Sequence, residues 1–307
     1  MYRFILLRLL LFIPTVLGVV TFTFLLIHLV PGDPVVLMLG DYATKQEIEQ
    51  TRSSLNLDKP ISTQYVLFLD DLLHGNLGTS IYYKKPVAGL VFERFKYTFV
   101  LAVFAMLLSL IISIPLGLIS GYEHDKWLDK FVSGVSILGI SLPNFWIGIM
   151  LIMLFAIKLN ILPVAGADSV SSIILPGLTL AIGMSAITIR MIRANAIKAI
   201  NQDNFAMNLA KGISVKRNLF IHTLKATLVP VITLIGMQFG LLLSGAIVTE
   251  TVFSWPGMGR LLVDSVMTRD YPLLSGDVLV VAFVYVTINL ITDIIYYIAD
   301  PRMIQKL

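Results

Sequence analysis

The sequence predicts an all-α integral membrane protein with six transmembrane helices. Of its 307 residues, 57% are hydrophobic and only 14% are charged, whereas a soluble globular domain has about a quarter charged residues. A membrane-spanning helix needs about 20 mostly apolar residues. Six segments meet or approach this length: Leu9–Val30, Phe99–Gly121, Phe131–Ile157, Ile173–Ile189, Ala226–Thr249 and Val278–Ala299.

The first segment is expected to be a retained span rather than a signal peptide. Two arginines precede Leu9–Val30, as in a signal peptide, but the apolar run exceeds the 7–15 residues of a signal-peptide core. No small-x-small cleavage site follows it. The fourth segment is short, and we expect it to extend to Met191 or Arg193, with its arginines reaching the membrane surface.

The basic residues predict the orientation. Cytoplasmic loops of membrane proteins carry an excess of Lys and Arg. The 190–225 loop holds seven, and the N-terminus, the 122–130 turn and the C-terminal tail each hold two. The short loops of the other face hold Lys158, Arg260 and Arg269. Both termini and the 190–225 loop are therefore expected in the cytoplasm.

The expected organisation has one sizeable extracytoplasmic piece. Residues 31–98 mix amphipathic helical periodicity with Gly and Pro breaks, which predicts a small helical insertion between spans 1 and 2. The expected divisions are an N-terminal cytoplasmic end and first span (1–30), this insertion (31–98), a five-helix core (99–300) with a cytoplasmic loop at 194–225, and a cytoplasmic tail (301–307).

The sequence lacks the motifs of the common catalytic and metal sites. It has no cysteine, no GxxxxGK[ST] phosphate loop, no HExxH and no GxSxG, and its four histidines lie far apart in the sequence. We therefore expect no catalytic residue, no metal and no nucleotide site on this chain. The net charge of +4 fits inside-positive loops and needs no nucleic-acid partner.

Polar residues and prolines inside the spans leave two questions open. Asp293 interrupts the last span, and an intramembrane carboxylate is a functional candidate by default, but a partner elsewhere in the bundle or a water-filled vestibule is the favoured interpretation. The prolines either bend helices that neighbouring helices stabilise or shape a pathway. They are Pro14, Pro115, Pro143, Pro176 and Pro230.

The basic loop is expected to form two helices. Asn195–Lys211 has good helix formers, and Gly212 can end that helix as a C-cap. Ser214 is a suitable N-cap for a second helix that runs into the fifth span. Phe205, Ala206 and Leu209 lie on adjacent turns, a surface suited to a groove on another protein.

The loop also carries a family resemblance. Residues 203–233, DNFAMNLAKGISVKRNLFIHTLKATLVPVIT, resemble the EAA loop of ATP-binding-cassette (ABC) importer permeases. Gly212 and the Leu-Val-Pro ending at Pro230 fit the pattern. The EAA triplet itself is not matched, because its positions hold Ala206, Met207 and Asn208.

Further stretches, in order along the whole chain, resemble the dipeptide/oligopeptide/nickel/glutathione permease family. They are LVPGDP, NLGTSIYYKKPV, SLPNFWIG, KLNILPVAGADS, FSWPGMGRLLVDSVMTRDYPLL and ADPR. Each is weak alone, but six in the same order make a specific signal. The stretches GADS and MQFGLLLSGAIVTETVFSWPGMGRLLVDSV are more similar to the glutathione and dipeptide members.

The resemblance implies a type I ABC importer permease in a bacterial inner membrane, forming half of a pathway for peptides. It implies a homologous second permease as heterodimer partner, two cytoplasmic ATP-binding subunits that use the ATP, an extracytoplasmic solute-binding protein and membrane lipid; no cofactor binds this chain. The implied ATPase-coupling residues, within 203–212, are Asn204, Phe205, Ala206, Asn208, Leu209 and Gly212.

Two further sets are predicted. Polar side chains of spans three and five, Ser141, Asn144, Gln238 and Ser244, are candidates to line the pathway. Trp255, Pro256 and Gly257, in a turn on the outer side, are candidates to contact the binding protein, together with the 31–98 insertion. Alternatively, the outer aromatic residues Phe253 and Trp255 anchor this turn at the membrane interface.

Three other functions compete with this prediction. The same class of importer carries nickel or a metal chelate in some members. A secondary transporter driven by an ion gradient would show paired half-repeats and broken helices, which the sequence lacks. A membrane enzyme is disfavoured because no catalytic constellation occurs.

Overall fold

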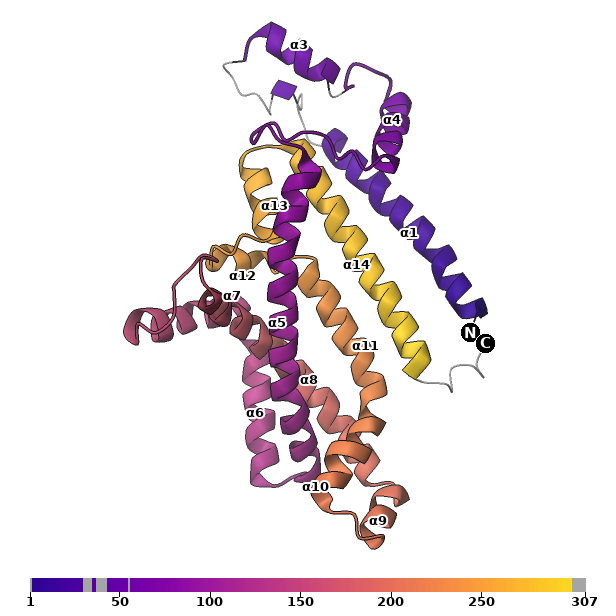
Figure 1. Ribbon diagram of the computed structural model, residues 1–307, viewed down its shortest axis with the longest axis vertical. Coiled ribbons are helices and arrows are strands. Elements are labelled where there is room, and N and C mark those ends of the chain that lie inside the picture. The colour runs from indigo at the N-terminus through magenta and orange to yellow at the C-terminus, as the bar shows by residue number, and fades with distance from the viewer. Residues whose placement is uncertain (1, 30–34, 37–42, 55, 300–307) are drawn as a thin grey trace.

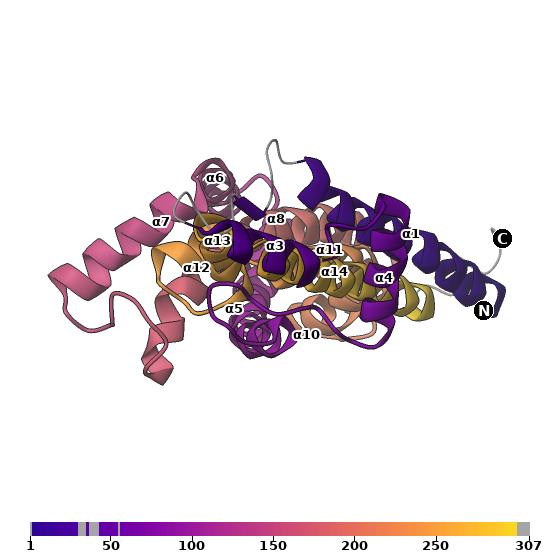
Figure 2. The ribbon, with the colours of Figure 1, turned by 90° about the horizontal axis from the view of Figure 1, so that it is seen from above.

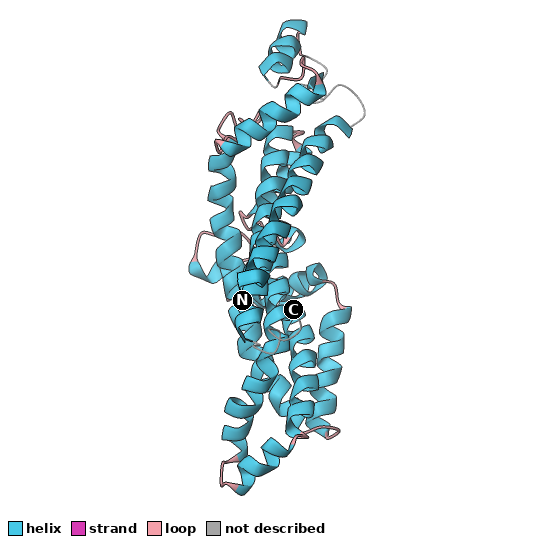
Figure 3. Ribbon diagram, turned by 90° about the vertical axis from the view of Figure 1, so that its right-hand side faces the viewer, coloured by secondary structure: helices cyan, strands magenta, loops and turns pink. Residues whose placement is uncertain are grey.

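A computed structural model describes residues 2–29, 35–36, 43–54 and 56–299, and these are almost entirely helical (Figures 1 and 3). The only β-structure among them is an isolated bridge between Thr79 and Pro86. The predicted 301–307 tail lies outside the described residues, as do most of LVPGDP and ADPR. The elements are α1 (Tyr2–Leu29), α3 (Lys45–Ser54), α4 (Ile61–Leu73), α5 (Val87–Tyr122), α6 (Trp127–Ser141), α7 (Asn144–Leu151), η1 (Ile152–Lys158), η2 (Val170–Ile173), α8 (Ile174–Ile200), α9 (Asp203–Ala210), α10 (Val215–Arg217), η3 (Asn218–Thr223), α11 (Leu224–Leu243), α12 (Ile247–Val252), α13 (Met258–Met267) and α14 (Tyr271–Ala299).

Four of the described helices are long and apolar enough to cross a membrane, and two bent pairs raise the number to six if each pair is one span. The four are α1, α5, α14 and η2–α8. The first bent pair is α6 with α7–η1, at 104°, and the second is the α10–α11 segment, at 67°. All six predicted apolar segments are therefore helical, and the count of six depends on these two pairs.

Several predicted limits were wrong. The second and sixth helices begin earlier than predicted, at Val87 and Tyr271. The third segment breaks at Leu142 and Pro143, both extended, because proline disfavours a helical residue before it. The fourth continues to Ile200, well past Arg193. The fifth ends at Leu243 rather than Thr249, and Gly245 follows with a φ of +97°, which a continuing helix cannot accommodate.

The prolines separate into two groups. Helices α1 and α5 continue through Pro14 and Pro115, and Pro176 lies in the first turn of α8, where the missing N–H costs nothing. Pro143 and Pro230 coincide with the two bends.

Small residues bring α5 and α8 into close contact at the centre of the bundle. A Cβ built on Gly117 would lie 2.7 Å from the Cβ of Ile192, and one on Gly121 would lie 2.7 Å from the Cβ of Ala196. Glycine at such positions lets membrane helices approach closely. The packing therefore joins α5 rigidly to α8.

Helix α1 lies beside α14 on the outside of the bundle (Figures 1 and 2). Arg8 Nη1 of α1 lies 3.1 Å from Asp293 Oδ2 of α14. The structure thus confirms the interpretation that Asp293 has a partner elsewhere in the bundle. Carboxylates within membrane spans are normally paired in this way.

The two ends of the molecule differ. Helices α3 and α4, from the 31–98 segment, lie at one end, and α9 and α10 lie at the opposite end (Figure 1). The later part of the 31–98 segment is attached to the core, because Ser80 donates a 2.5 Å hydrogen bond to Asp270, just before α14. The same carboxylate accepts from the backbone N–H of Tyr82 at 3.1 Å.

Candidate functional site

Helix α9 is a short separate helix at one end of the molecule (Figure 1). The prediction of one helix over Asn195–Lys211 was wrong, because α8 ends at Ile200 and α9 spans Asp203–Ala210. The chain turns at Asn201 and Gln202, and Gln202 has an extended backbone. Asp203 lies in the first turn of α9, where an acidic side chain interacts favourably with the helix dipole.

Both predicted caps around the end of α9 are confirmed. Gly212 has a φ of +81°, and its N–H donates to Leu209 O at 2.9 Å while Ile213 N–H donates to Asn208 O at 3.1 Å. A Cβ at Gly212 would meet no atom within 4 Å, so backbone conformation rather than space requires glycine. Ser214 accepts from Arg217 N at 3.4 Å as the N-cap of α10.

Asn218 holds α9 in place. Its fully buried side chain donates to Phe205 O at 3.0 Å and accepts from Asn208 Nδ2 at 3.0 Å. Phe205 is itself buried and lies against the ring of Tyr122, with centroids 6.4 Å apart. Because buried amides without partners are costly, these bonds fix α9 on η3. The sequence pattern did not predict Asn218, which stands ten residues from Asn208.

The six residues predicted for ATPase coupling therefore divide between two faces. Phe205 faces inward, whereas Asn204, Ala206, Leu209 and Gly212 are exposed and Asn208 is half-buried. A polar pocket of about 310 Å³ opens beside the face of α9 that packs on η3. Its polar walls come from Gln202, Asn204, Asn208, Asn218, His222 and Thr223. Exposed cations surround α9: Lys198, Lys211, Lys216 and Arg217.

The predicted pathway residues lie in two places. Ser141 and Asn144 are exposed at the α6–α7 bend. Gln238 is buried, accepts from Thr188 Oγ1 at 3.2 Å and donates to Met184 O at 3.3 Å, so it links α11 to α8. Ser244, half-buried, donates to Gly240 O within its own helix.

The α6–α7 bend and the break between α11 and α12 border one cavity. A pocket of about 360 Å³ is lined by Asn144 and Phe145 of α7, by Leu180 of α8 and by residues 245–249 around the α11–α12 break. Asn144 also lies against α8, because a Cβ at Gly183 would lie 2.8 Å from its Oδ1. Irregular backbone at membrane depth is tolerated where it lines a cavity, and the α6–α7 bend and the α11–α12 break both lie at this one.

The turn after α12 is organised by Glu250, which the sequence pattern did not single out. Glu250 is fully buried and accepts from Thr98 Oγ1 at 2.8 Å and from Arg260 N at 3.1 Å. Thr98 in turn accepts from Met258 N at 2.9 Å. Burial raises the pKa of the Glu250 carboxyl, although hydrogen bonds from Thr98 and from the backbone N–H groups of Arg260 and Gly259 oppose the rise.

The residues predicted to contact a binding protein belong to this turn. Trp255 is buried and donates to Tyr97 O at 3.0 Å. Gly257 is also buried, and a Cβ there would overlap the Glu250 carboxylate, while Pro256 is half-exposed. Phe253 is buried too, so the structure places both aromatic residues inside the protein rather than on a membrane-facing surface.

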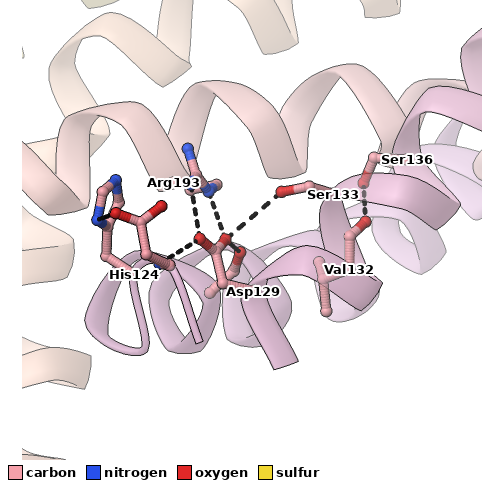
Figure 4. Close-up of polar contacts among 8 residues, drawn as sticks. His124, Asp129, Val132, Ser133, Ser136 and Arg193 are labelled. Carbon is pink, nitrogen blue, oxygen red and sulfur yellow. Dashed lines mark hydrogen bonds and ion pairs between the residues drawn. The ribbon is translucent and has the colours of Figure 1, made fainter. Parts of the chain in front are cut away.

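A second buried carboxylate joins α6 to α8 (Figure 4). Asp129 lies 2.5 Å from Arg193 Nε and 2.6 Å from its Nη2. Ser120 Oγ and Asp125 N donate to the same carboxylate at 2.5 and 2.9 Å. His124, Asp125 and Asp129 lie close enough together to hold a cation, but Arg193 already neutralises Asp129.

Comparison with known proteins identifies the family. The family model described as "Binding-protein-dependent transport system inner membrane component" matches residues 113–305. A model of the corresponding N-terminal region matches residues 1–110. The chain belongs to this family. It is therefore the permease component of an ABC importer, with the all-helical type I permease fold, and the ATPase of such a system is a separate subunit.

Curated relatives match over their whole length. The chain is 40% identical over 306 residues, covering 100% of both chains, to the glutathione transport system permease protein GsiC of Pectobacterium atrosepticum. It is 38% and 37% identical, again over 306 residues and 100% of both chains, to the proteins of the same name from Escherichia coli O6:H1 and Shigella dysenteriae serotype 1.

Proposed function

We propose that this permease forms half of a translocation pathway for glutathione or short peptides. The relatives that it matches over their full length are named as glutathione transport permeases, which favours this substrate class over nickel or a metal chelate. A homologous second permease would complete the pathway, and an extracytoplasmic binding protein would deliver the solute. A secondary transporter is disfavoured because family members depend on binding-protein systems.

The way α9 is fixed to η3 supports the proposal that separate ATPases drive this chain. One face of α9 is fixed to η3 through Asn218, and the other face is exposed among cations. A helix held this firmly at one side can transmit a push received at the other. We propose that two cytoplasmic ATP-binding subunits dock on this exposed face, and that the chain binds no nucleotide and catalyses no reaction itself.

Substitution of Gly212 tests the coupling. Open space surrounds this position, and Asp and Asn both tolerate a positive φ better than other side chains. In the complete transporter reconstituted in vesicles, we expect Gly212→Asp to abolish ATP-driven glutathione uptake, because it puts a negative charge at the docking face, while membrane insertion stays normal. Gly212→Asn is the isosteric neutral control and should keep most of the uptake.

Two results would contradict the proposal. Normal uptake by Gly212→Asp with ATPases present would remove α9 as the docking helix. Competition of the transported solute by nickel chelates, but not by glutathione or dipeptides, would assign the system to the metal-chelate branch.

A further inference from the structure

Helix α6 is attached to α8 at two separate points. Near the outer end of α6, a Cβ at Gly139 would lie 3.1 Å from Ala186 Cβ, which is close helix–helix contact. Near its inner end, Asp129 pairs with Arg193. The two attachments are about 15 Å apart along α6 and about 10 Å apart along α8, at 1.5 Å per residue. Antiparallel helices held at two points cannot pivot about either one.

The inner attachment is a strong interaction. Asp129 is only 2% exposed, and the guanidinium engages it through two nitrogens (Figure 4). Bidentate, charge-assisted bonds of this kind are strong and directional. Without Arg193 the charge of the buried Asp129 would be uncompensated, whereas the Arg193 side chain is 26% exposed and can be solvated when Asp129 is neutral. By contrast, the Glu123–Lys126 pair joins two residues of the same turn rather than two helices, and its Lys126 side chain is 68% exposed.

The pair lies between two regions that matter for transport. Only Asn201 and Gln202 separate α8 from α9, so α8 is the helix that directly precedes the one proposed to meet the ATPases. The other end of α6 is the bend that carries Ser141 and Asn144 and borders the cavity at the helix breaks. Helix α6 thus connects helix α8 to that bend.

We propose that the Asp129–Arg193 ion pair makes α6 move with α8 as one body, so that a displacement of α9 reaches the 141–144 bend. Asp129 and Arg193 are then positioning residues for transport: they touch neither solute nor nucleotide, but they set how much α9 movement reaches the pathway. This inference rests on the proposed docking of ATPases at α9.

The test measures coupling in the complete transporter. With Asp129→Asn, we expect the amount of glutathione taken up per ATP hydrolysed to fall about fivefold, within the range of coupling effects seen for residues between two sites. The ATPase rate should change less than the uptake. Glu123→Gln, which breaks the neighbouring Glu123–Lys126 pair within one turn, is the matched control and should keep the parental ratio.

A distance measurement separates positioning from a loss of structure. The chain has no cysteine, so Lys130→Cys and Lys198→Cys, both at exposed positions, accept two spin labels on α6 and α8. Their separation should stay constant between the nucleotide-free and ATP-bound states in the parent. In Asp129→Asn it should change or broaden on ATP binding. A parental uptake ratio, or a lower ratio with an unchanged separation, would overturn the proposal.

Two further variants keep the test decisive. If Asp129→Asn does not accumulate in the membrane, Arg193→Lys replaces it, because lysine keeps the charge and loses the bidentate geometry. Arg193→Lys should show the same loss of coupling in smaller degree. A parental ratio of uptake to ATP hydrolysis in Arg193→Lys would refute the inference. Gly212→Asp is run in parallel. If that variant loses uptake while the pair variants do not, only this inference fails; if Gly212→Asp transports normally, the proposed docking at α9 fails.

Discussion

Buried acidic side chains act as connectors in this protein. Asp129, Glu250 and Asp270 come from different parts of the chain, and each accepts hydrogen bonds from a segment distant in sequence. A carboxylate has about four acceptor sites, so a single residue can hold several backbone and side-chain donors. In a bundle with few polar groups, such connectors fix the loops that apolar packing alone leaves undefined.

Glu250 predicts a specific pH dependence. Burial raises its pKa, so the folded state keeps this proton at pH values where the unfolded chain has lost it. The contribution of Glu250 to stability therefore falls as pH rises from about 4.3, the ordinary value. We expect the melting temperature of the purified transporter to drop between pH 5 and pH 8 more steeply in the parent than in Glu250→Gln, which does not titrate.

The quantity to compare is the slope of melting temperature against pH in the parent and in Glu250→Gln, not the absolute melting temperature of either. Glu250→Gln replaces one oxygen by an amide nitrogen, so its absolute stability can differ from that of the parent even where Glu250 is protonated. Parallel pH profiles in the parent and the variant would show that Glu250 is charged throughout this range.

At the scale of elements, the sequence predicts where helices occur better than where they end. Apolar runs of about 20 residues located all six segments, and turn chemistry located Gly212 and Ser214. The end of α8 was missed because hydropathy stops near Ile189 while the helix continues through polar helix formers such as Arg193 and Lys198. Charge marks where a membrane surface lies, not where backbone hydrogen bonding stops.

The contacts of the site were less predictable than the helices. Asp129 and Arg193 stand 64 residues apart, and Thr98 and Glu250 152 residues apart. Nothing in local pattern joins such pairs, because they depend on how the helices pack. For the same reason Phe205 was expected on a docking surface but is buried against Tyr122, since the bend at Gln202 rotates α9 relative to a continuous helix.

The close packing of α5 on α8 gives a prediction for one glycine. A Cβ at Gly121 would lie 2.7 Å from Ala196 Cβ and 3.1 Å from Arg193 O. Overpacking of this kind typically costs 1–3 kcal/mol, so Gly121→Ala should lower the free energy of unfolding by about 2 kcal/mol. Thermal melting of the purified parent and Gly121→Ala proteins in detergent measures this loss of stability.

Two companion variants make that result specific. Adding Ala196→Gly to Gly121→Ala removes the nearest clash and should restore much of the stability. Gly134→Ala on α6 is the control, because a Cβ there meets no atom within 4 Å and alanine is the better helix former. Equal destabilisation by Gly134→Ala and Gly121→Ala would show that helix packing is not the cause.

At the scale of the whole molecule, function is distributed along one axis. The 31–98 helices lie at one end and α9 lies at the other, and the α6–α7 bend and the α11–α12 break, which border one cavity, lie between them (Figure 1). Helices α8 and α6 connect the α9 end to the breaks. A permease needs this separation, because solute delivery and ATP hydrolysis occur on opposite sides of the membrane.

The distribution of basic residues predicts how that axis is oriented in the membrane. The 190–225 loop holds seven Lys and Arg residues, so the α9 end is predicted to face the cytoplasm. Because the chain has no cysteine, single replacements report sidedness directly. A membrane-impermeant maleimide added to spheroplasts should label Val66→Cys on α4 and leave Lys216→Cys unlabelled. Both native side chains are exposed, so accessibility within the fold does not bias the comparison.

Inverted vesicles provide the complementary measurement, in which Lys216→Cys should react and Val66→Cys should not. Labelling of Lys216→Cys in intact spheroplasts would place α9 outside the cell. No cytoplasmic ATPase could then reach α9, and the proposed coupling through Gly212 and through the Asp129–Arg193 pair would fail together. Sidedness is therefore the one property of the whole molecule on which both coupling proposals depend.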